Sequence, residues 1–414
     1  MISFEEAQAL IIAACEPTGT EMVAIDQAVE RVLARTLYAD ADLVPFARSA
    51  MDGYALRSAD AFLGAILPVR EHVYAEPSGP VRHDARTATQ IATGAPIPRG
   101  ADAVIPIEEV VRENGSIRLA APVGVGTHIF PPGEDARAGD RLLAAGRRLR
   151  PADIGLLAAG GHVQLMVFRR PVAVVLTTGD EVVDPSQVPS HGQIRNSNAA
   201  LINATLAAWG CAVAVQEHVR DDEGAVRAAF EQHLGTCDLL ITTGGASVGE
   251  RDLVKTVLAG PFEFDSVALR PAKPTAFALK GRTRVLVLPG NPSSAFVALH
   301  EFVRLAAFSM LGEAEVRLPR VVAKLAGAIH GKASRTYAAY AILSTTADGF
   351  VATPLVNQCS ALTRTASDAS GFIVLPPGAR DLGAGEQVSF DIVDWSRVAG
   401  SPSARDPLSP GLRT

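Results

Sequence analysis

Short apolar runs alternate with longer amphipathic stretches between residues 171 and 311, and this is the most regular pattern in the chain. A continuous β-branched run such as PVAVVL is typical of a strand buried on both faces, whereas apolar positions every three or four residues predict a helix. The alternation predicts a mostly parallel α/β sheet with helices on both faces. The expected strands are 171–176, 211–219, 239–241 and 284–288, and the expected helices are 198–209, 221–234, 253–258 and a long apolar helix from the PGNPSS segment to Leu311.

The flanking regions have a different texture. At the N-terminus, Ser3 and Glu6 form a capping-box pattern that predicts a helix, and a second helical pattern follows Asp26 with Val29, Val32 and Leu33 on one face. A further helix is predicted over 151–159, ending at a Gly-Gly pair. We interpret the first two of these helices as scaffold.

Two regions consist of short apolar runs divided by Pro and Gly, as in small β domains. One covers about residues 66–145, and the other begins near Glu315 and suggests a compact barrel or sandwich of about eighty residues. The strands expected in the second region are 320–325, 337–343, 349–354, 371–375 and 387–392. Residues 400–414 are rich in Pro and Ser and are expected to be a disordered tail.

Three loops leave the carboxyl ends of the predicted parallel strands, where α/β sheets bind ligands. They read TTGDEV (177–182), TTGGASVGERD (242–252) and PGNPSS (289–294). Paired glycines bring backbone N–H groups close to an anion, and a hydroxyl at Ser247 and a carboxylate at Asp252 add polar groups. Each loop also fits an ordinary strand-to-helix turn, but their convergence predicts one anion-binding site.

Further candidate groups lie beside these loops. Asn291 and Pro292 suit the N-cap and first position of a helix, whose N-terminus would favour an anion, although an ordinary capped helix fits as well. Lys273, between two prolines, could contact such an anion. In the β region, Asp52–Gly53 reads either as a hairpin turn or as a carboxylate reaching into a cleft, and Thr93–Gly94 offers a hydroxyl and a free N–H.

Composition narrows the class of protein. The 414 residues suffice for about three domains, and 48% apolar with 20% charged residues indicates a soluble globular chain. A net charge of −6 without a basic run argues against nucleic acid. The widely spaced Cys15, Cys211, Cys237 and Cys359 are interpreted as buried thiols of a reducing compartment. No basic signal region and no membrane span is recognised, so a cytoplasmic location without membrane contact is expected.

Taken together, the motifs SFEEA, SAMDGYA, IATGAPIP, GAD, GED, TTGDE, TTGGASVGERD, LPGNPSSAF and AGEQV resemble the molybdopterin molybdenumtransferases, also found as the C-terminal half of gephyrin. The resemblance covers roughly residues 1–394. It implies an α/β multidomain chain with a molybdopterin-binding α/β domain, an inserted β domain, an elongated helical scaffold and a C-terminal β-barrel. The implied limits are scaffold 1–44 and 141–168, inserted domain 45–140, α/β domain 169–313, barrel 314–397 and disordered tail 398–414.

The same resemblance implies the reaction and the partners. Adenylyl-molybdopterin and molybdate would give molybdenum cofactor and AMP with Mg²⁺, in a homodimer whose active site is shared between chains. Transient contacts with a molybdopterin adenylyltransferase and with molybdoenzyme acceptors are implied as well. Alternatives are adenylylation of molybdopterin, which the length of the chain disfavours, and a non-catalytic molybdopterin carrier, which the acidic residues disfavour.

The site residues implied by the matched motifs fall into three groups. Catalytic roles fall to Asp52, Glu181 and Asp252, and the Mg²⁺ ligands would be drawn from Asp180, Glu181, Asp221 and Asp252. The substrate-binding set is Thr93, Gly94, Asp135, Thr178, Gly179, Gly244, Gly245, Ser247, Gly249, Lys273, Pro289, Gly290, Asn291, Pro292, Ser293 and Ser294.

The chain departs from the family pattern at four places. It has Ala272 where the family has the glycine of PGKP, Ala246 for valine and Glu250 for aspartate. The family often has a basic residue just before the GED motif, whereas this chain has Phe130–Pro132 there. Ala272 is expected to restrict the backbone beside Lys273, and the missing basic residue removes an anion contact near Asp135.

Overall fold

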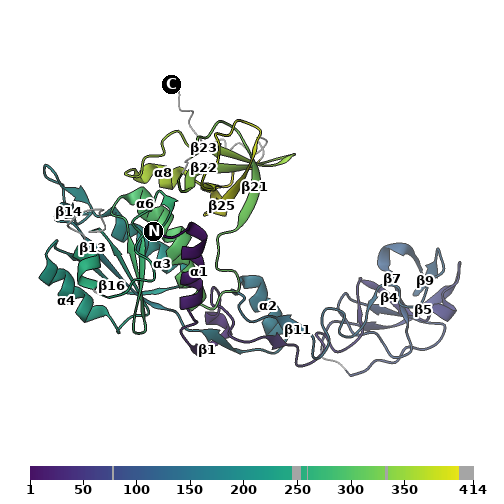
Figure 1. Cartoon of the computed structure of the whole chain (residues 1–414). Coiled ribbons are helices and arrows are strands. Elements are labelled where there is room, and N and C mark those ends of the chain that lie inside the picture. The colour runs from purple at the N-terminus through teal and green to yellow at the C-terminus, as the bar shows by residue number, and fades with distance from the viewer. Residues whose placement is uncertain (77–78, 245–252, 259, 332–333, 401–414) are drawn as a thin grey trace.

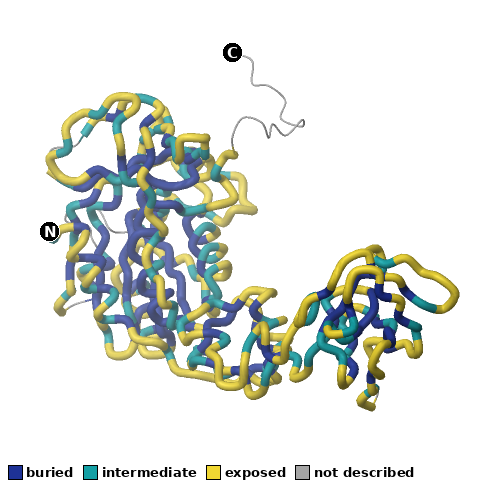
Figure 2. The backbone as a smooth tube through the Cα atoms, turned by 90° about the vertical axis from the view of Figure 1, so that its right-hand side faces the viewer, coloured by how far each residue is buried: buried dark blue, intermediate teal, exposed yellow. Residues whose placement is uncertain are grey.

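The computed structural model describes residues 1–76, 79–244, 253–258, 260–331 and 334–400. The molecule is elongated, with a helix-covered sheet and a C-terminal barrel at one end and a separate small β sheet at the other (Figure 1). The chain leaves the larger end after β2 (Leu37–Tyr38) and returns at β11 (Arg141–Leu143), and these two strands pair with each other. Each end has its own buried core (Figure 2).

The central sheet has five strands in the order β16-β13-β17-β20-β19. The first four are parallel, as the sequence predicts, and β19 is antiparallel to β20. The strand β19 was not predicted; it forms a hairpin with β20 through Gly281, which has a φ of 61°. The strands are β13 (Val172–Thr178), β16 (Ala212–Val219), β17 (Leu239–Thr243), β19 (Ala276–Lys280) and β20 (Thr283–Leu288).

Helices cover both faces of this sheet, as predicted. One face packs on α1, α3, α6 and α7, and the other on α4 and α5. The expected long helix to Leu311 is interrupted by a π-helical turn over Leu299–Val303. The helices are α1 (Phe4–Ala14), α3 (Ser197–Trp209), α4 (Glu223–His233), α5 (Leu253–Leu258), α6 (Pro292–Ala298) and α7 (Arg304–Met310).

Between the two ends lies a narrow region with less helix than the sequence suggests. α2 (Pro151–Ala159) forms as predicted, and β1 (Thr20–Ala24) pairs with β12 (Gln164–Phe168). The second helix expected after Asp26 is wrong, because the helical turn covers only Ile25–Gln27. Val32 and Leu33 instead form bridges to Arg148 and Val167, since a neighbouring strand offers these β-branched and apolar positions a partner.

The distal sheet has the order β7-β4-β6-β5-β9-β8. The hairpin interpretation of Asp52–Gly53 is wrong: β3 (Arg48–Ser49) pairs with β10 (Ile129–Phe130), while β4 pairs with β6 and β7. Short helical turns cover Ser58–Asp60 and Ile107–Glu109. The strands are β4 (Gly53–Leu56), β5 (Ile66–Val73), β6 (Ala88–Ile91), β7 (Ala103–Pro106), β8 (Val110–Glu113) and β9 (Ser116–Leu119).

The C-terminal strands form a barrel, as predicted, because β22 pairs with both β23 and β24 and so closes the sheet. α8 (Thr363–Asp368) packs against α6, and a short helical turn covers Trp395–Arg397. Within the described residues, no helix combines the length and apolarity needed to cross a membrane. The strands are β18 (Leu269–Arg270), β21 (Arg320–Leu325), β22 (Thr336–Thr346), β23 (Gly349–Pro354), β24 (Gly371–Leu375) and β25 (Gln387–Ile392).

The four cysteines are all free thiols. Three are buried as expected, and burial raises the pKa of Cys15 and of Cys211 to about 12. The expectation is wrong for Cys359, which is exposed in the segment between β23 and α8.

Candidate functional site

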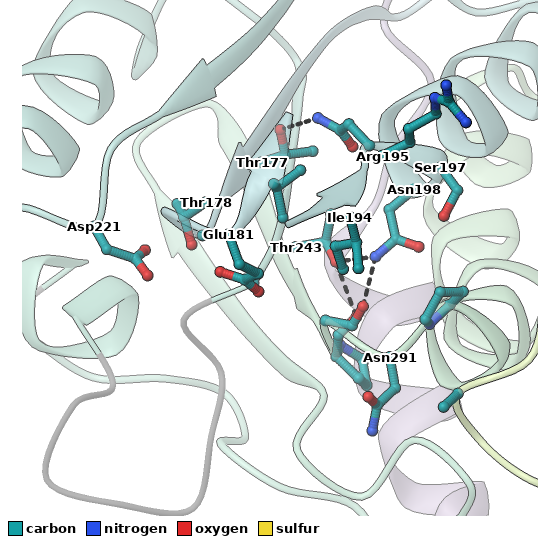
Figure 3. Close-up of a pocket in the computed structure, with 18 of the residues that line it drawn as sticks. Thr177, Thr178, Glu181, Ile194, Arg195, Ser197, Asn198, Asp221, Thr243 and Asn291 are labelled. Atoms are coloured by element: carbon teal, nitrogen blue, oxygen red, sulfur yellow. Dashed lines mark hydrogen bonds between the residues drawn. The ribbon is translucent and has the colours of Figure 1, made fainter. Parts of the chain in front are cut away.

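A cavity of about 610 Å³ lies at the carboxyl ends of the parallel strands (Figure 3). All three loops singled out in the sequence contribute to its wall, so the predicted convergence is confirmed for their described residues. The sequence-predicted residues among its lining are Thr178, Gly179, Glu181, Asp221, Gly244, Pro289, Gly290, Asn291 and Pro292.

Gly244 allows two of these loops to approach each other closely. Its φ is +95°, and a Cβ at this position would overlap the carbonyl oxygen of Thr178 and lie 2.8 Å from its Oγ1. Gly290 follows β20, the next strand of the sheet, and a Cβ on Gly290 would lie 3.5 Å from Gly244 Cα. Glycine is therefore required here for both backbone conformation and space.

A hydrogen-bonded network fixes the ends of β17 and β20 relative to α3. Asn198 Nδ2 donates to Thr243 Oγ1 at 3.1 Å and to the Gly290 carbonyl at 2.8 Å, and Thr243 Oγ1 donates to the Pro289 carbonyl at 2.9 Å. Figure 3 shows this network on one side of the cavity. Because these bonds connect α3 to both strand ends and the two strand ends to each other, the network holds this part of the cavity wall in one arrangement.

Sequence reasoning missed a fourth segment of the wall, Ile194–Asn198. It runs from β15 (Ile194–Arg195), which pairs with β14 (Val182–Val183), into the start of α3. Asn196 is the N-cap of α3, and its Nδ2 donates to Thr177 Oγ1 at 2.8 Å. The available signal was the Asn-Ser-Asn run ahead of a helix, since asparagine is both a capping residue and a side-chain donor.

The carboxylates lie at one end of the cavity. Glu181 and Asp221 line it, and exposed Asp180 accepts a hydrogen bond from the Asp221 backbone N–H at 3.2 Å. Among the described residues, no group of three or more His, Cys, Asp or Glu side chains is arranged to hold a metal ion. Mg²⁺ commonly takes only one or two carboxylates and completes its shell with water and substrate phosphates, so this donor set fits a substrate-bridged Mg²⁺.

The PGNPSS segment begins α6 as predicted, with Pro292 at the first helical position, but Asn291 makes no side-chain capping bond. Ser293 and Ser294 are buried and do not line the cavity. The Ser293 carbonyl accepts a hydrogen bond from the Tyr340 hydroxyl of the barrel at 2.5 Å. This contact attaches the barrel to the first turn of α6.

Lys273 is half-buried next to Pro274, which lines the cavity. The preceding residue, Ala272, is buried with a φ of +85°, a backbone region that favours glycine. The Ala272 carbonyl accepts hydrogen bonds from both the N–H and the hydroxyl of Thr275. The departure from the glycine of PGKP therefore leaves an alanine in a strained conformation beside Lys273.

The remaining described candidates belong to the distal end. The backbone N–H of Thr93 donates to Asp52 Oδ1 at 2.7 Å, and Gly94 turns with a φ of +79°. Asp135 is exposed on the segment that returns from the distal sheet. The distal sheet is remote from β13 and β14 (Figure 1), so one chain does not bring these residues to the cavity. Four further candidates, Gly245, Ser247, Gly249 and Asp252, lie outside the described residues.

The architecture is that of a molybdopterin-biosynthesis protein. Two solved structures of the MoeA protein of this pathway from Pyrococcus horikoshii each cover 95% of the chain, with TM-scores of 0.82 and 0.78 at 26% and 28% identity. The alignments span 100% and 99% of those chains. Family models match over most of the length: the MoeA N-terminal region (domains I and II) at residues 2–161, a probable molybdopterin binding domain at 174–307, and the MoeA C-terminal region (domain IV) at 322–392.

Curated relatives give the family its name. The chain is 31% identical over 388 residues to the molybdopterin molybdenumtransferase of Staphylococcus aureus strain Mu50, covering 90% of this chain and 91% of that protein. It is 37% identical to the Synechococcus elongatus enzyme over 73% of this chain and 79% of that one. The chain belongs to the molybdopterin molybdenumtransferase family, transferase enzymes of molybdenum cofactor biosynthesis.

Proposed function

We propose that the protein inserts molybdate into adenylyl-molybdopterin, forming molybdenum cofactor and releasing AMP in a Mg²⁺-dependent reaction. The observation that carries this proposal is the cavity in which the glycine-containing strand-end loops meet Glu181 and Asp221. Backbone N–H groups at such turns suit phosphate and molybdate, which are both oxyanions. Relatives named molybdopterin molybdenumtransferase support the choice of substrates.

The acidic side chains support a role for Mg²⁺ at this cavity. When bound, Mg²⁺ supplies charge neutralisation of the phosphoanhydride during its cleavage. One or two of the carboxylates of Asp180, Glu181, Asp221 and Asp252 would hold the ion, and water and the substrate phosphates would complete the coordination. Lys273, Thr178 and Gly244 would face the anionic part of the substrate.

We further propose that the active site is shared within a homodimer. Asp52 and Thr93 hydrogen-bond to each other at the distal end of the molecule, far from Glu181 in the same chain (Figure 1). A second chain with two-fold symmetry can place its distal sheet beside this cavity and bring the two acidic groups together. Asp52 and Asp135 would then act with the carboxylates of the other chain.

The remaining proposals concern organisation and location. We propose that the scaffold comprises residues 1–44 and 141–168, the inserted domain 45–140, the α/β domain 169–313 and the barrel 314–397. The free thiols support a reducing compartment such as the cytoplasm. Delivery of substrate by a molybdopterin adenylyltransferase, and of product to molybdoenzymes, follows from the proposed reaction.

The test is a defined reaction with purified protein, adenylyl-molybdopterin, Mg²⁺ and molybdate. We expect AMP release that requires both molybdate and Mg²⁺, together with formation of molybdenum cofactor. AMP release independent of molybdate would contradict insertion. Formation of adenylyl-molybdopterin from ATP and molybdopterin would instead support the adenylyltransferase alternative, and binding without turnover would support a carrier.

A further inference from the structure

A second cavity of about 320 Å³ adjoins the main one. The two share Ser197, Asn198 and Pro292 in their walls, so they are neighbouring compartments separated by the start of α3 and of α6. The main cavity alone contains the carboxylates, and Pro292 is the one residue of the strand-end loops that also lines the second cavity. The second compartment, called the side cavity below, is lined by Ser197, Asn198, Leu201, Pro292, Phe296, Thr363, Ala366 and Ser367.

The side cavity differs chemically from the main one. Its described lining residues carry no charge, so it offers nothing to pair with a phosphate or molybdate group. Leu201, Pro292, Phe296 and Ala366 make its walls apolar. Exposed hydroxyl groups of Ser197, Thr363 and Ser367 stand among them. Apolar walls with a few polar groups are typical of sites for flat organic ligands.

Phe296 gives the side cavity a fixed aromatic wall. The half-buried ring has its centroid 4.5 Å from that of His300 and 6.0 Å from that of Phe372, which it meets edge to face. These contacts restrict the motion of the ring. A fixed aromatic ring at a cavity wall provides a surface on which a planar heteroaromatic ligand can stack.

Asn198 supplies an unsatisfied acceptor at the wall that the cavities share. It is 9% exposed, and its Nδ2 is committed to Thr243 and Gly290. Its Oδ1 is buried without a hydrogen-bond partner and points away from that network (Figure 3). A buried carbonyl oxygen without a donor is costly, and a ring N–H or amino group would satisfy it.

We infer that the side cavity binds the planar nitrogen-heteroaromatic ring of the substrate while the main cavity holds its anionic part. This inference rests on the proposed function, under which the substrate carries two such rings, a pterin and an adenine. Both offer a flat face and N–H donors, so they share the chemistry that the side cavity fits. The barrel thereby acquires a role in substrate recognition, because Thr363, Ala366 and Ser367 belong to α8.

The test fills the side cavity and compares two probes. Ala366→Phe places a ring into the cavity from α8, and Arg364→Phe is the matched control, because Arg364 is exposed on the same helix and does not line the cavity. Binding of AMP and of 6-carboxypterin is measured by calorimetry and by pterin fluorescence. We expect Ala366→Phe to weaken one probe at least about tenfold and Arg364→Phe to weaken neither. The affected probe identifies the ring.

A second variant covers the case in which Ala366→Phe does not fold. Phe296→Leu keeps an apolar side chain but removes the aromatic face, and we expect about tenfold weaker binding of the same probe. If the wild-type protein binds neither fragment, the comparison is made with adenylyl-molybdopterin, for which the same weakening is expected. Wild-type affinity in every folded cavity variant would overturn the inference.

The outcomes separate this inference from the proposed reaction. If Ala366→Phe weakens probe binding but the wild-type protein shows no molybdate-dependent AMP release, the ring site is supported and the proposed reaction is refuted. If the wild-type protein shows molybdate-dependent turnover but no cavity variant weakens probe binding, the proposed reaction is supported and the ring site is overturned.

Discussion

The side-chain amide of Asn198 donates a hydrogen bond to Thr243 Oγ1 across 3.1 Å and thereby connects the first turn of α3 to the end of β17. The same Nδ2 reaches the Gly290 carbonyl of a third segment. Neither residue was predicted to act in the site, yet their bond joins the walls on which the predicted residues stand. Loss of this bond is therefore expected to affect both stability and ligand binding.

Replacing Asn198 by alanine removes both donations and leaves buried acceptors unpaired. We expect the free energy of unfolding to fall by about 1–3 kcal/mol and substrate affinity to fall with it. Asn203→Ala is the matched control, because Asn203 lies on the same helix and bonds Gln216 rather than the cavity wall. Denaturant titration of both variants checks the stability; equal losses would contradict a special role for Asn198.

Gly244→Ala tests the close approach of two cavity loops. The Cβ would overlap the Thr178 carbonyl in addition to occupying a φ of +95°. Gly235→Ala has a similar φ of +80° but meets nothing within 4 Å, so it should cost only about 1–2 kcal/mol for the backbone conformation. We expect a distinctly larger loss for Gly244→Ala in denaturant titration. Equal losses would show that the loops separate freely.

Ala272→Gly should stabilise the protein. Ala272 has a φ of +85°, a conformation that costs a residue with a Cβ about 1–2 kcal/mol, and glycine removes most of that strain. We expect a gain of about 1 kcal/mol in the free energy of unfolding. The control is Ala276→Gly in buried β19, which should destabilise the protein. A loss at both positions would argue against strain at Ala272.

His300 should make stability fall at acidic pH. Burial, with a smaller effect of the Arg304 charge, lowers the pKa of His300 from 6.5 to about 3. The unfolded chain therefore takes up a proton as the pH drops through 6.5, whereas the folded protein does not, and stability decreases from pH 6.5 toward 3. His300→Phe should flatten this part of the profile, and His191→Phe, at an exposed position, should not. Unfolding midpoints measured across this range check the expectation.

A shared active site predicts complementation between two inactive variants. We expect Asp52→Ala and Glu181→Ala to lose molybdate-dependent AMP release by at least about a hundredfold each, because each removes a reacting-site carboxylate. If the site combines two chains, randomly mixed dimers regain about a quarter of wild-type activity, since half the dimers then contain one intact site of two. Dimers mixed after dissociation and reassembly provide the measurement. Failure to regain activity would contradict an active site shared between Asp52 of one chain and Glu181 of the other.

Local patterns predicted most of the elements in this chain. Ser3 is the N-cap of the first helix as expected, with Ser3 Oγ accepting from the Glu6 N–H, and the parallel strands β13, β16, β17 and β20 are recognisable because burial on both faces leaves continuous apolar runs. The strand β19 was not predicted because its apolar run is short and follows a Pro-rich segment. The helix expected after Asp26 was wrong because bridges to distant strands outcompete a weak local preference.

The sequence by itself determined that the three loops 177–182, 242–252 and 289–294 follow three of the four predicted parallel strands, and parallel strands place their carboxyl ends at one edge of a sheet. It also determined the family, because several motifs occur in a fixed order. Only the tertiary structure decided that Asn196 and Asn198 complete the wall, that Asp52 lies far from Glu181 in one chain, and that α8 closes a side cavity. These depend on contacts between segments distant in sequence, and no local pattern of side chains encodes such distances.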